Sequence, residues 1–576
     1  MKAKVVYLSL ALLALSLPYT PPTAAQSEEC PCCYVPEAVN NPDLARYENP
    51  GTAPNTPTGE KTVPKLSIGY VDFGVTGKAA IRDEFDLGLG MLHHMMYRQA
   101  RSTFESIAED DPNCAMAYWG IATSLFQPLW PGRPSAEDLK RGWELTHHAH
   151  QLAQTDRERL LIEATAAFFR DWDTADYWTR IARWAEGLEQ AYEAHPDDLD
   201  IASLYGLSRV ALAQVVRNRG PLLDEAERVL RKVFETAPRH PGGIHYTIHA
   251  TDVDGRADNA LDMVRAYGEI APNVPHALHM PTHLYVRLGH WPEVISWNAR
   301  SAKSALDYPV GDRVSLHHIH ALDYKLYGYL QQANDERAYE VLREALTTAP
   351  YQDDFIVAFH KAIMPARYAV ERRDWESAAS IKPDRPEYLS WERYGWPQAI
   401  SWFARGMGAV NTGDMDAARE AEEQMITLRD AAREAGEQAF ETYIEVDRLI
   451  LSGWLAWADG NHDKAVNHIR ESAALEPTVE KHPVTPGALY PPLEALGDLL
   501  MALDRPDEAL EAYEAADAIW PGRRNTLLGA TRAARVQGEQ NQAHAFYERL
   551  LQSAGMDDHP LIVEARHLIS MAAEPE

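Results

Sequence analysis

The chain has 576 residues, which is too long for one compact core, so several domains or an extended repeat array are expected. Hydrophobic residues make up 45 % and charged residues 24 % of it, as in an ordinary folded soluble protein. Acidic residues outnumber basic ones by 85 to 55, and the resulting formal net charge of −30 disfavours nucleic acid and anionic membranes as partners.

The N-terminus has the pattern of an export signal. Two lysines precede an apolar run over residues 5–17, and the small residues Thr23 and Ala25 fit a cleavage site before Gln26. The run is too short to span a bilayer as a stable anchor, and no later segment is long and apolar enough. We therefore expect residues 1–25 to be a signal peptide and the mature protein to be periplasmic or secreted.

Residues 26–83 form a segment rich in proline, asparagine and threonine that contains a cysteine cluster. The motif CPCC supplies three of the four cysteines, and Cys114 is the fourth. In an oxidising compartment a disulfide is the first expectation, with its connectivity open. The cluster could instead bind a soft metal such as copper(I). Its members are Cys30, Cys32 and Cys33.

Repeating offsets begin near residue 84, where the pattern becomes helical with closely spaced turn signals. In the stretch YRQARSTFESIAEDDP an aromatic residue is followed by a small residue, large apolar residues and a proline. Similar offsets return in LGHWPEVISWNARSA, QANDERAYEVLREALTTAP, GNHDKAVNHIRESAALEP and RPDEALEAYEAADAIWP. A small residue lets two helices approach, a large residue fills the gap between neighbouring helix pairs, and proline stops the second helix.

These offsets resemble the tetratricopeptide repeat, a pair of antiparallel helices in 34 residues. The resemblance runs from residue 84 to about 555 and implies an all-α solenoid, a right-handed superhelix of helix pairs with a concave groove. We expect N-terminal repeat-like helices over 84–198, central repeats over 199–352 and C-terminal repeats over 353–576. The stretches HPGGIHYTIHATD and HALHMPTHLY, with FESIAEDDPNCAMAYWGIA and PPLEALGDLLMALDRPDEAL, are similar to exported bacterial proteins of this repeat class, which implies export and the same fold.

Two histidine pairs stand in register with the repeat. His245 and His249 are followed 34 residues later by His279 and His283, and each pair is spaced i,i+4 on the first helix of its repeat. In tetratricopeptide solenoids the first helices line the concave groove, so we expect the four imidazoles to converge. Pro281 predicts either a kink between the second pair or a helix that begins there.

The next repeat adds a carboxylate. Asp323 takes the place of His245 and His279, counted back from the small residue of its repeat, and His320 precedes it by three residues. Close imidazoles cannot all be protonated, whereas neutral ring nitrogens bind a cation and a carboxylate offsets its charge. The sequence therefore predicts a copper, zinc or iron ion, with manganese also compatible, held by His245, His249, His279, His283, His320 and Asp323.

Plainer explanations stay open for this pattern. Copying of one ancestral repeat with two structural histidines would also give the interval, although Asp323 departs from the copied pattern. Tyrosines on the same helices fit a ligand groove or the filling of repeat interfaces; they are Tyr246, Tyr285, Tyr324 and Tyr327.

The remaining histidines are expected to have lesser roles. Those near the pairs are interpreted as donors behind the ligands or as surface residues: His240, His276, His317, His318 and His360. Those earlier in the chain are interpreted as chance neighbours, because a chain with 23 histidines contains some close pairs; they are His93, His94, His147, His148 and His150.

Three functions fit these observations. The first is a metal-binding solenoid, including a metalloenzyme whose open coordination position activates water or dioxygen. The alternative is a peptide- or protein-binding scaffold of the cell envelope with no catalytic activity. The third is a copper chaperone or sensor in which CPCC delivers the ion. The sequence contains no P-loop, no G-x-S-x-G and no H-E-x-x-H, and it indicates no substrate.

Overall fold

The computed structural model describes residues 66–130, 132–216, 218–348, 350–555 and 559–570. The expected signal peptide and the CPCC motif lie outside these residues. Within them the chain is helical almost throughout, and its β-structure is limited to isolated bridges such as that between Val310 and Arg313. No helix in the described ranges has the length and apolar character needed to cross a membrane. The all-α prediction is confirmed.

The helices before the histidine pairs follow one another closely. They are η2 (Ala79–Ile81), α1 (Arg82–His93), α2 (Tyr97–Asp110), α3 (Ala115–Thr123), α4 (Ala136–Leu152), α5 (Asp156–Phe169), α6 (Tyr177–Ala194), α7 (Leu199–Ala213) and α8 (Gly220–Thr236).

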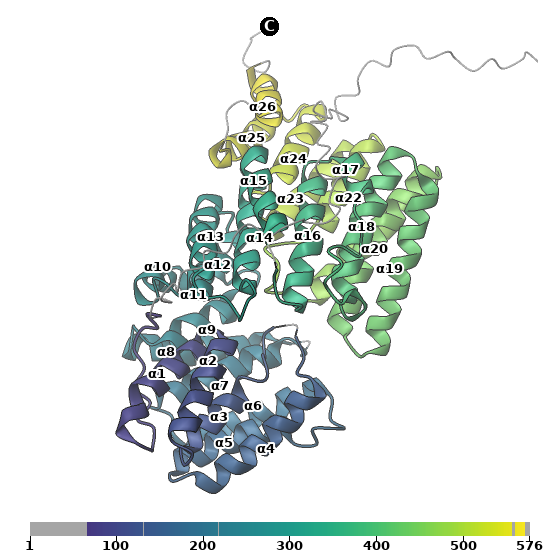
Figure 1. Cartoon of the computed structure of the whole chain (residues 1–576). Helices are drawn as coiled ribbons and strands as arrows, with labels where there is room; N and C mark the ends of the chain where they lie inside the picture. Colours follow the sequence, from purple (N-terminus) through teal and green to yellow (C-terminus); the bar gives the residue numbers. More distant parts are fainter. Residues whose placement is uncertain (1–65, 131, 217, 349, 556–558, 571–576) are drawn as a thin grey trace, which may run out of the picture. The chain divides into compact units, whose positions relative to one another are not determined.

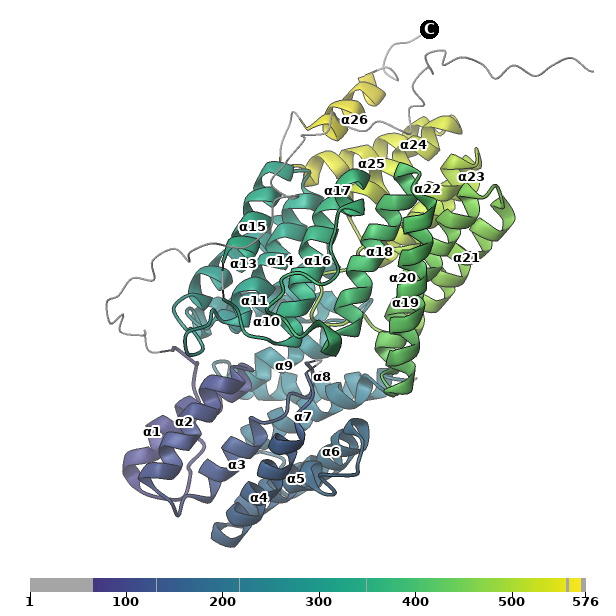
Figure 2. The same ribbon diagram turned by 45° about the vertical axis from the view of Figure 1, so that its right-hand side comes forward.

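The middle helices carry the candidate ligands. They are α9 (Pro241–Thr251), η3 (Ala257–Ala260), α10 (Leu261–Ile270), α11 (Pro275–His279), α12 (Pro281–Arg287), α13 (Trp291–Ala305), α14 (Leu316–Gln331), α15 (Asp335–Thr347) and α16 (Phe355–Glu371). In both views α13, α14, α15 and α16 run side by side (Figure 1, Figure 2).

The remaining helices continue the array. They are α17 (Trp375–Ala379), η4 (Trp391–Arg393), α18 (Gly395–Thr412), α19 (Met415–Glu434), α20 (Gln438–Ala458), α21 (His462–Leu475), η5 (Glu476–Thr478), α22 (Pro492–Ala502), α23 (Pro506–Ile519), α24 (Arg524–Val536), α25 (Gln540–Ser553) and α26 (Pro560–Ser570).

Helix pairing follows the repeat pattern of the sequence. Each helix packs against the next one along the chain, and first helices also touch the first helices of neighbouring pairs, as α14 touches α16 and α18 touches α20. Phe104 of α2 lies between two glycines: a Cβ at Gly88 would lie 3.0 Å from its Cε1, and one at Gly120 would lie 2.5 Å from its Cδ2. The aromatic ring thus fills the space that the missing side chains leave.

Lys361 on α16 is a buried amine that pairs with no carboxylate in the part of the chain that the structure describes. Its side chain is 6 % exposed, its Nζ donates to Ala345 O over 2.6 Å, and the ring centre of Tyr351 is 5.0 Å from Nζ. Burial disfavours the charged ammonium and lowers the pKa of Lys361 to about 7. The folded protein therefore binds fewer protons at this residue than the unfolded chain does above that pH.

Lys361→Met is expected to raise the free energy of unfolding by a few kcal/mol at pH 6 to 7, since the cost of a buried charge is fully present there. Stability of the unaltered protein should rise between pH 7 and 10, because there the buried amine is neutral while the lysine of the unfolded chain is still protonated. The advantage of the variant should therefore shrink across that window. Urea unfolding at several pH values measures this. Lys140→Met, at a side chain that is 60 % exposed, is the matched control and should change little. A pH-independent difference would contradict the expectation.

Candidate metal centre

Glycines let α9 approach the helices beside it. Pro241 occupies the first turn of α9, where its missing N–H is not needed. A Cβ at Gly242 would lie 2.6 Å from Ser203 Cβ, and one at Gly243 would lie 3.0 Å from Phe234 N. The HPGG start therefore seats α9 tightly against α7 and α8. His245 and His249 follow on one face, with ring centres 5.2 Å apart.

Pro281 interrupts the helix between the second pair without turning the pair apart. His279 ends α11 and Pro281 begins α12, while Met280 between them keeps helical angles (φ −54°, ψ −41°). Thr282 Oγ1 donates to His279 O over 2.6 Å, which gives a partner to a carbonyl at the break. The ring centres of His279 and His283 remain 4.8 Å apart, as an i,i+4 pair requires.

His279, His283 and His320 form a compact triad. One ring nitrogen from each lies within 4.8 Å of the others, and the ring centres of His279 and His320 are 4.2 Å apart. His279 and His283 come from α11 and α12, the two halves of one interrupted first helix, and His320 comes from α14, the first helix of the next pair. We call this group the α14 triad.

Hydrogen bonds fix the protonation of two members of the α14 triad. Asn298 Nδ2 donates to Val294 O over 2.8 Å, so Asn298 presents Oδ1 to His279 Nδ1, 2.7 Å away. His283 Nδ1 donates to Asp252 Oδ2 over 2.8 Å. Burial lowers the pKa of both imidazoles. Each neutral ring therefore carries its hydrogen on Nδ1 and a lone pair on Nε2, and these two Nε2 atoms are only 3.0 Å apart.

A longer chain of contacts orients the third member. Arg367 Nε donates to Asp323 Oδ1 over 3.2 Å, and Asp323 Oδ2 accepts from His360 Nδ1 over 3.2 Å. His360 Nε2 is then an acceptor, and it faces His320 Nδ1 at 2.9 Å. His320 is accordingly protonated at Nδ1 and free to bind an ion through Nε2. All three rings of the α14 triad are set as Nε2 ligands.

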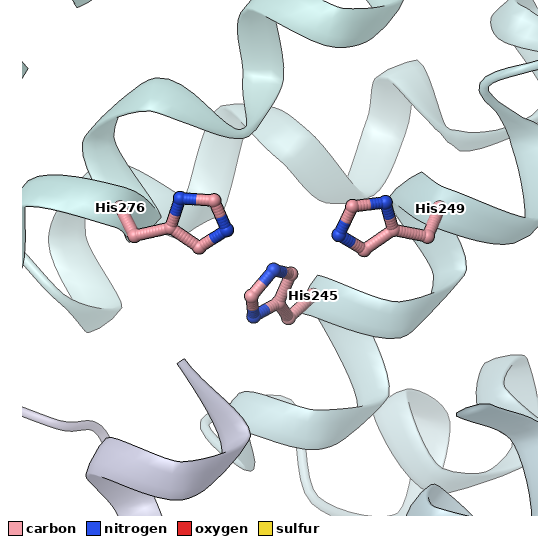
Figure 3. A group of neighbouring side chains, drawn as sticks. All are labelled: His245, His249 and His276. Carbon is pink, nitrogen blue, oxygen red and sulfur yellow. The ribbon is translucent and has the colours of Figure 1, made fainter. Parts of the chain in front are cut away.

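His245, His249 and His276 form a second group, which we call the α9 triad. One nitrogen of each ring lies within 4.8 Å of the others, and Figure 3 shows a nitrogen of each ring facing the space between them. His245 Nδ1 donates to His93 O over 2.6 Å, which leaves a lone pair on Nε2. No hydrogen-bond partner within the described residues reaches His245 Nε2, His249 Nε2 or either nitrogen of His276, although all are buried.

A small cavity joins the two triads. The centre of a water molecule could occupy about 20 Å³ of it, enough for about one water-sized ligand. Its lining includes members of both triads together with a loop from the C-terminal half and two residues that follow α3: His249, His276, His283, His320, His482, Pro483, Val484, Leu129 and Trp130.

A third cluster, His93, Asp200 and His240, is built differently. His93 Nε2 and His240 Nε2 both donate to Asp200 Oδ1, over 3.0 and 3.1 Å. Burial opposes the charge on Asp200, but the hydrogen bonds from His240 and His93 hold the pKa of this carboxyl well below its usual range. The ring nitrogens that face the carboxylate are satisfied by it, so this cluster stabilises the contact of α1 with α7 and α9.

The structure brings five of the six sequence-predicted ligands together and places the sixth behind them. His245, His249, His279, His283 and His320 belong to the two triads. Asp323 contacts His360 and Arg367 instead of an ion position.

Several other predictions about histidines change in the structure. His276, expected to be a donor behind the ligands or a surface residue, completes the α9 triad, and its spacing of three residues before His279 is the signal that could have identified it. His93 and His94, interpreted as chance neighbours in the sequence, are fully buried, and both are hydrogen-bonded to other buried side chains. His147, His148 and His150 are exposed. Cys114 is buried and forms no disulfide with another described residue.

Comparisons with known proteins found only distant similarity to solved structures. No family model matches the chain, and no curated protein matches it. Solved structures with helical arrays include yeast Tom70, with 12 % identity, a TM-score of 0.35, and coverage of 85 % of this chain and 96 % of that one. The Cut9–Hcn1 hetero-tetramer of the APC/C has 12 % identity and a TM-score of 0.30, with 86 % and 90 % covered. A human IFIT1 dimer with PPP-AAAA has 14 % identity and a TM-score of 0.36, with 82 % and 90 % covered. Identities of 12–14 % with TM-scores of 0.30–0.36 support no argument about the function of this chain.

Proposed function

We propose that the protein is an exported tetratricopeptide-type protein that binds a transition metal ion through the α14 triad, His279, His283 and His320. The observation that carries the proposal is the pair of Nε2 lone pairs held 3.0 Å apart, because Asn298 Oδ1 and Asp252 Oδ2 accept the hydrogens on the opposite ring nitrogens. Two such lone pairs repel, and a cation between them converts the repulsion into two bonds. Export rests on the N-terminal sequence pattern.

The donor set suits zinc, copper or iron. Three nitrogens bound at about 2.0–2.1 Å to a tetrahedral ion lie about 3.3 Å from one another, so a separation within 4.8 Å needs only small ring movements. Each ligand ring has a partner on its other nitrogen, as metal-binding histidines almost always have. Three protein ligands leave one coordination position open toward the cavity, which is the arrangement of catalytic zinc sites and permits water or dioxygen to bind.

The burial of these rings argues against the alternative of a peptide-binding face. A bound peptide must touch the side chains that recognise it, yet all members of the two triads are at most 7 % exposed. Chains of oriented hydrogen bonds behind buried imidazoles are the feature of an ion site rather than of an open groove.

Measuring the metal bound to the purified, exported protein tests the proposal. The protein should be loaded with Zn²⁺ after chelation and counted for bound metal, and His279→Ala/His320→Ala should lose at least one ion per chain. His147→Ala/His150→Ala removes two exposed histidines of α4 and should retain the full amount. Circular dichroism establishes that each variant is folded. The site would be refuted if wild-type protein bound no metal after loading. It would also be refuted if His279→Ala/His320→Ala bound as much metal as wild-type protein.

A further inference from the structure

We infer that the centre holds two ions, the second bound by His245, His249 and His276 beside the first. The inference deepens the proposed function and rests on it for the first ion. The second position stands on its own geometry, because the α9 triad shares no ligand with the α14 triad.

Unpartnered nitrogens carry the argument for the second ion. His245 Nε2, His249 Nε2 and both nitrogens of His276 are buried, and nothing in the described ranges hydrogen-bonds to them. Leaving one buried polar atom unsatisfied costs about 1–3 kcal/mol, so several in one place need a common partner. The His93–Asp200–His240 cluster shows the other solution, a carboxylate that accepts from two rings. The α9 triad has no such carboxylate, and a cation can bind one nitrogen from each of its rings.

The direction of His245 supports an ion rather than a hydrogen-bonded ring cluster. Its Nδ1 hydrogen is committed to His93 O, so the nitrogen facing the triad can only accept. His249 and His276 approach the same space with ring nitrogens (Figure 3), and the ring centres of His245 and His276 are 5.0 Å apart.

The two ion positions are neighbours. Rings from opposite triads approach closely at three places: His249 and His283 have centres 5.7 Å apart, His276 and His279 5.9 Å, and His276 and His320 6.4 Å. α11 supplies one ligand to each triad, through His276 and His279, so a single short helix holds both positions in register.

The shared cavity indicates the class of ligand that two such ions would bind. It is lined by His249 and His276 from one triad and by His283 and His320 from the other, with about 20 Å³ between them. That space takes about one water-sized ligand, and a hard oxygen donor can bind both ions at once. A water molecule or a hydroxide ion meets both requirements.

Stoichiometry of the loaded full-length protein tests the inference. Wild-type protein loaded with Cu²⁺ should hold two ions per chain, and each of two variants should hold one: His245→Gln/His276→Gln and His279→Gln/His320→Gln. The exposed pair His147→Gln/His150→Gln should keep two. Electron paramagnetic resonance on the same samples should give a reduced, coupled signal from wild-type protein and about one uncoupled spin per chain from either one-ion variant.

The results distinguish failure of the second ion site, at the α9 triad, from failure of the first, at the α14 triad. One ion per chain in wild-type protein, unchanged in His245→Gln/His276→Gln, overturns the second site and leaves the first. No bound ion overturns both. Two ions with independent spins overturn their adjacency, and the wild-type spectrum decides this even where a variant does not fold.

Discussion

Asp252→Asn is expected to lower the free energy of unfolding by about 3–5 kcal/mol and to weaken metal binding by about 10–100-fold. The Asp252 carboxylate accepts from His283 Nδ1 over 2.8 Å, from Arg287 Nε over 3.0 Å and from Lys481 Nζ over 3.2 Å. Burial opposes its charge, but Lys481, Arg287 and His283 hold the pKa of Asp252 well below its usual range. Neutralising it leaves the buried ammonium of Lys481 without its ion pair, while Arg287 keeps Glu480. It also replaces one of the two acceptor oxygens that serve His283 and Arg287 by an amide NH2.

Urea unfolding and competitive metal titration measure the two effects. Asp254→Asn is a control of the same chemistry: Asp254 also pairs with Arg287 through Nη1, but its side chain is 60 % exposed. A pair exposed to that extent contributes about 1 kcal/mol or less, so stability and metal affinity should hardly change. Equal losses in the two variants would mean that the burial of Asp252 has no special effect.

The repeat architecture was predictable because its cause is local. A small residue, a large one and a proline recur within each pair, and a pair packs chiefly on its neighbours. Tyr513 lies between Gly497 and Gly529, whose missing Cβ atoms would lie 2.6 and 2.4 Å from its ring. This is the arrangement of Phe104 with Gly88 and Gly120 at the other end of the array. The residue types at fixed positions of the repeat therefore specify how neighbouring helices pack.

The candidate site was predictable from the two histidine pairs that keep the repeat register and from the acidic residue beside His320 in the next repeat. Register placed His245, His249, His279 and His283 on facing first helices, and all four belong to the triads. His276 precedes His279 by three residues, as His320 precedes Asp323, but the repeat before it has Gly242 at that place, so a search based on the two i,i+4 pairs passes over it. Register alone cannot give the direction of a side chain.

Asp323 and Lys481 show two other limits of sequence reasoning. Asp323 has the right register but turns toward α16, where Arg367 and His360 bind it. Lys481 reaches Asp252 across 229 residues of sequence, a contact that no spacing rule contains.

A segment from the C-terminal half explains why first-helix histidines are buried instead of lining an open face. Tyr324 OH donates to Pro483 O over 2.8 Å, and Arg367 Nη2 donates to Thr485 Oγ1 over 3.0 Å. Together with His482, which lines the cavity, these contacts lay the loop after η5 against the middle repeats. Burial removes competing water from the ring nitrogens, so we expect metal binding at the candidate centre to depend on the folding of the late repeats.

Arg523→Met is expected to lower the free energy of unfolding by about 3–5 kcal/mol, because Arg523 links the late repeats to the middle ones through a buried charge network. Its side chain is 1 % exposed. Nε lies 3.0 Å from Glu494 Oε2, Nη2 lies 2.8 Å from Glu371 Oε1, and Nη1 donates to Tyr327 OH over 2.7 Å. Methionine fills much of the same volume but leaves both carboxylates with less positive charge beside them. Burial opposes ionisation of Glu494, whereas Arg523 and Arg373 lower its pKa, so loss of Arg523 should also raise that pKa.

The matched control is Arg549→Met, which breaks an ion pair with Asp517 at a side chain that is 42 % exposed and should cost about 1 kcal/mol or less. Urea unfolding gives the loss of stability in each variant. Metal content under native conditions shows whether the loss extends to the candidate metal centre. Since Arg523 touches neither triad, folded Arg523→Met should keep its ions, while the urea concentration at which they are released should fall together with the unfolding midpoint. Ion release that stays at the wild-type urea concentration while the late repeats unfold earlier would show that the centre forms without them, and the coupling argued from Tyr324 and Arg367 would then be wrong.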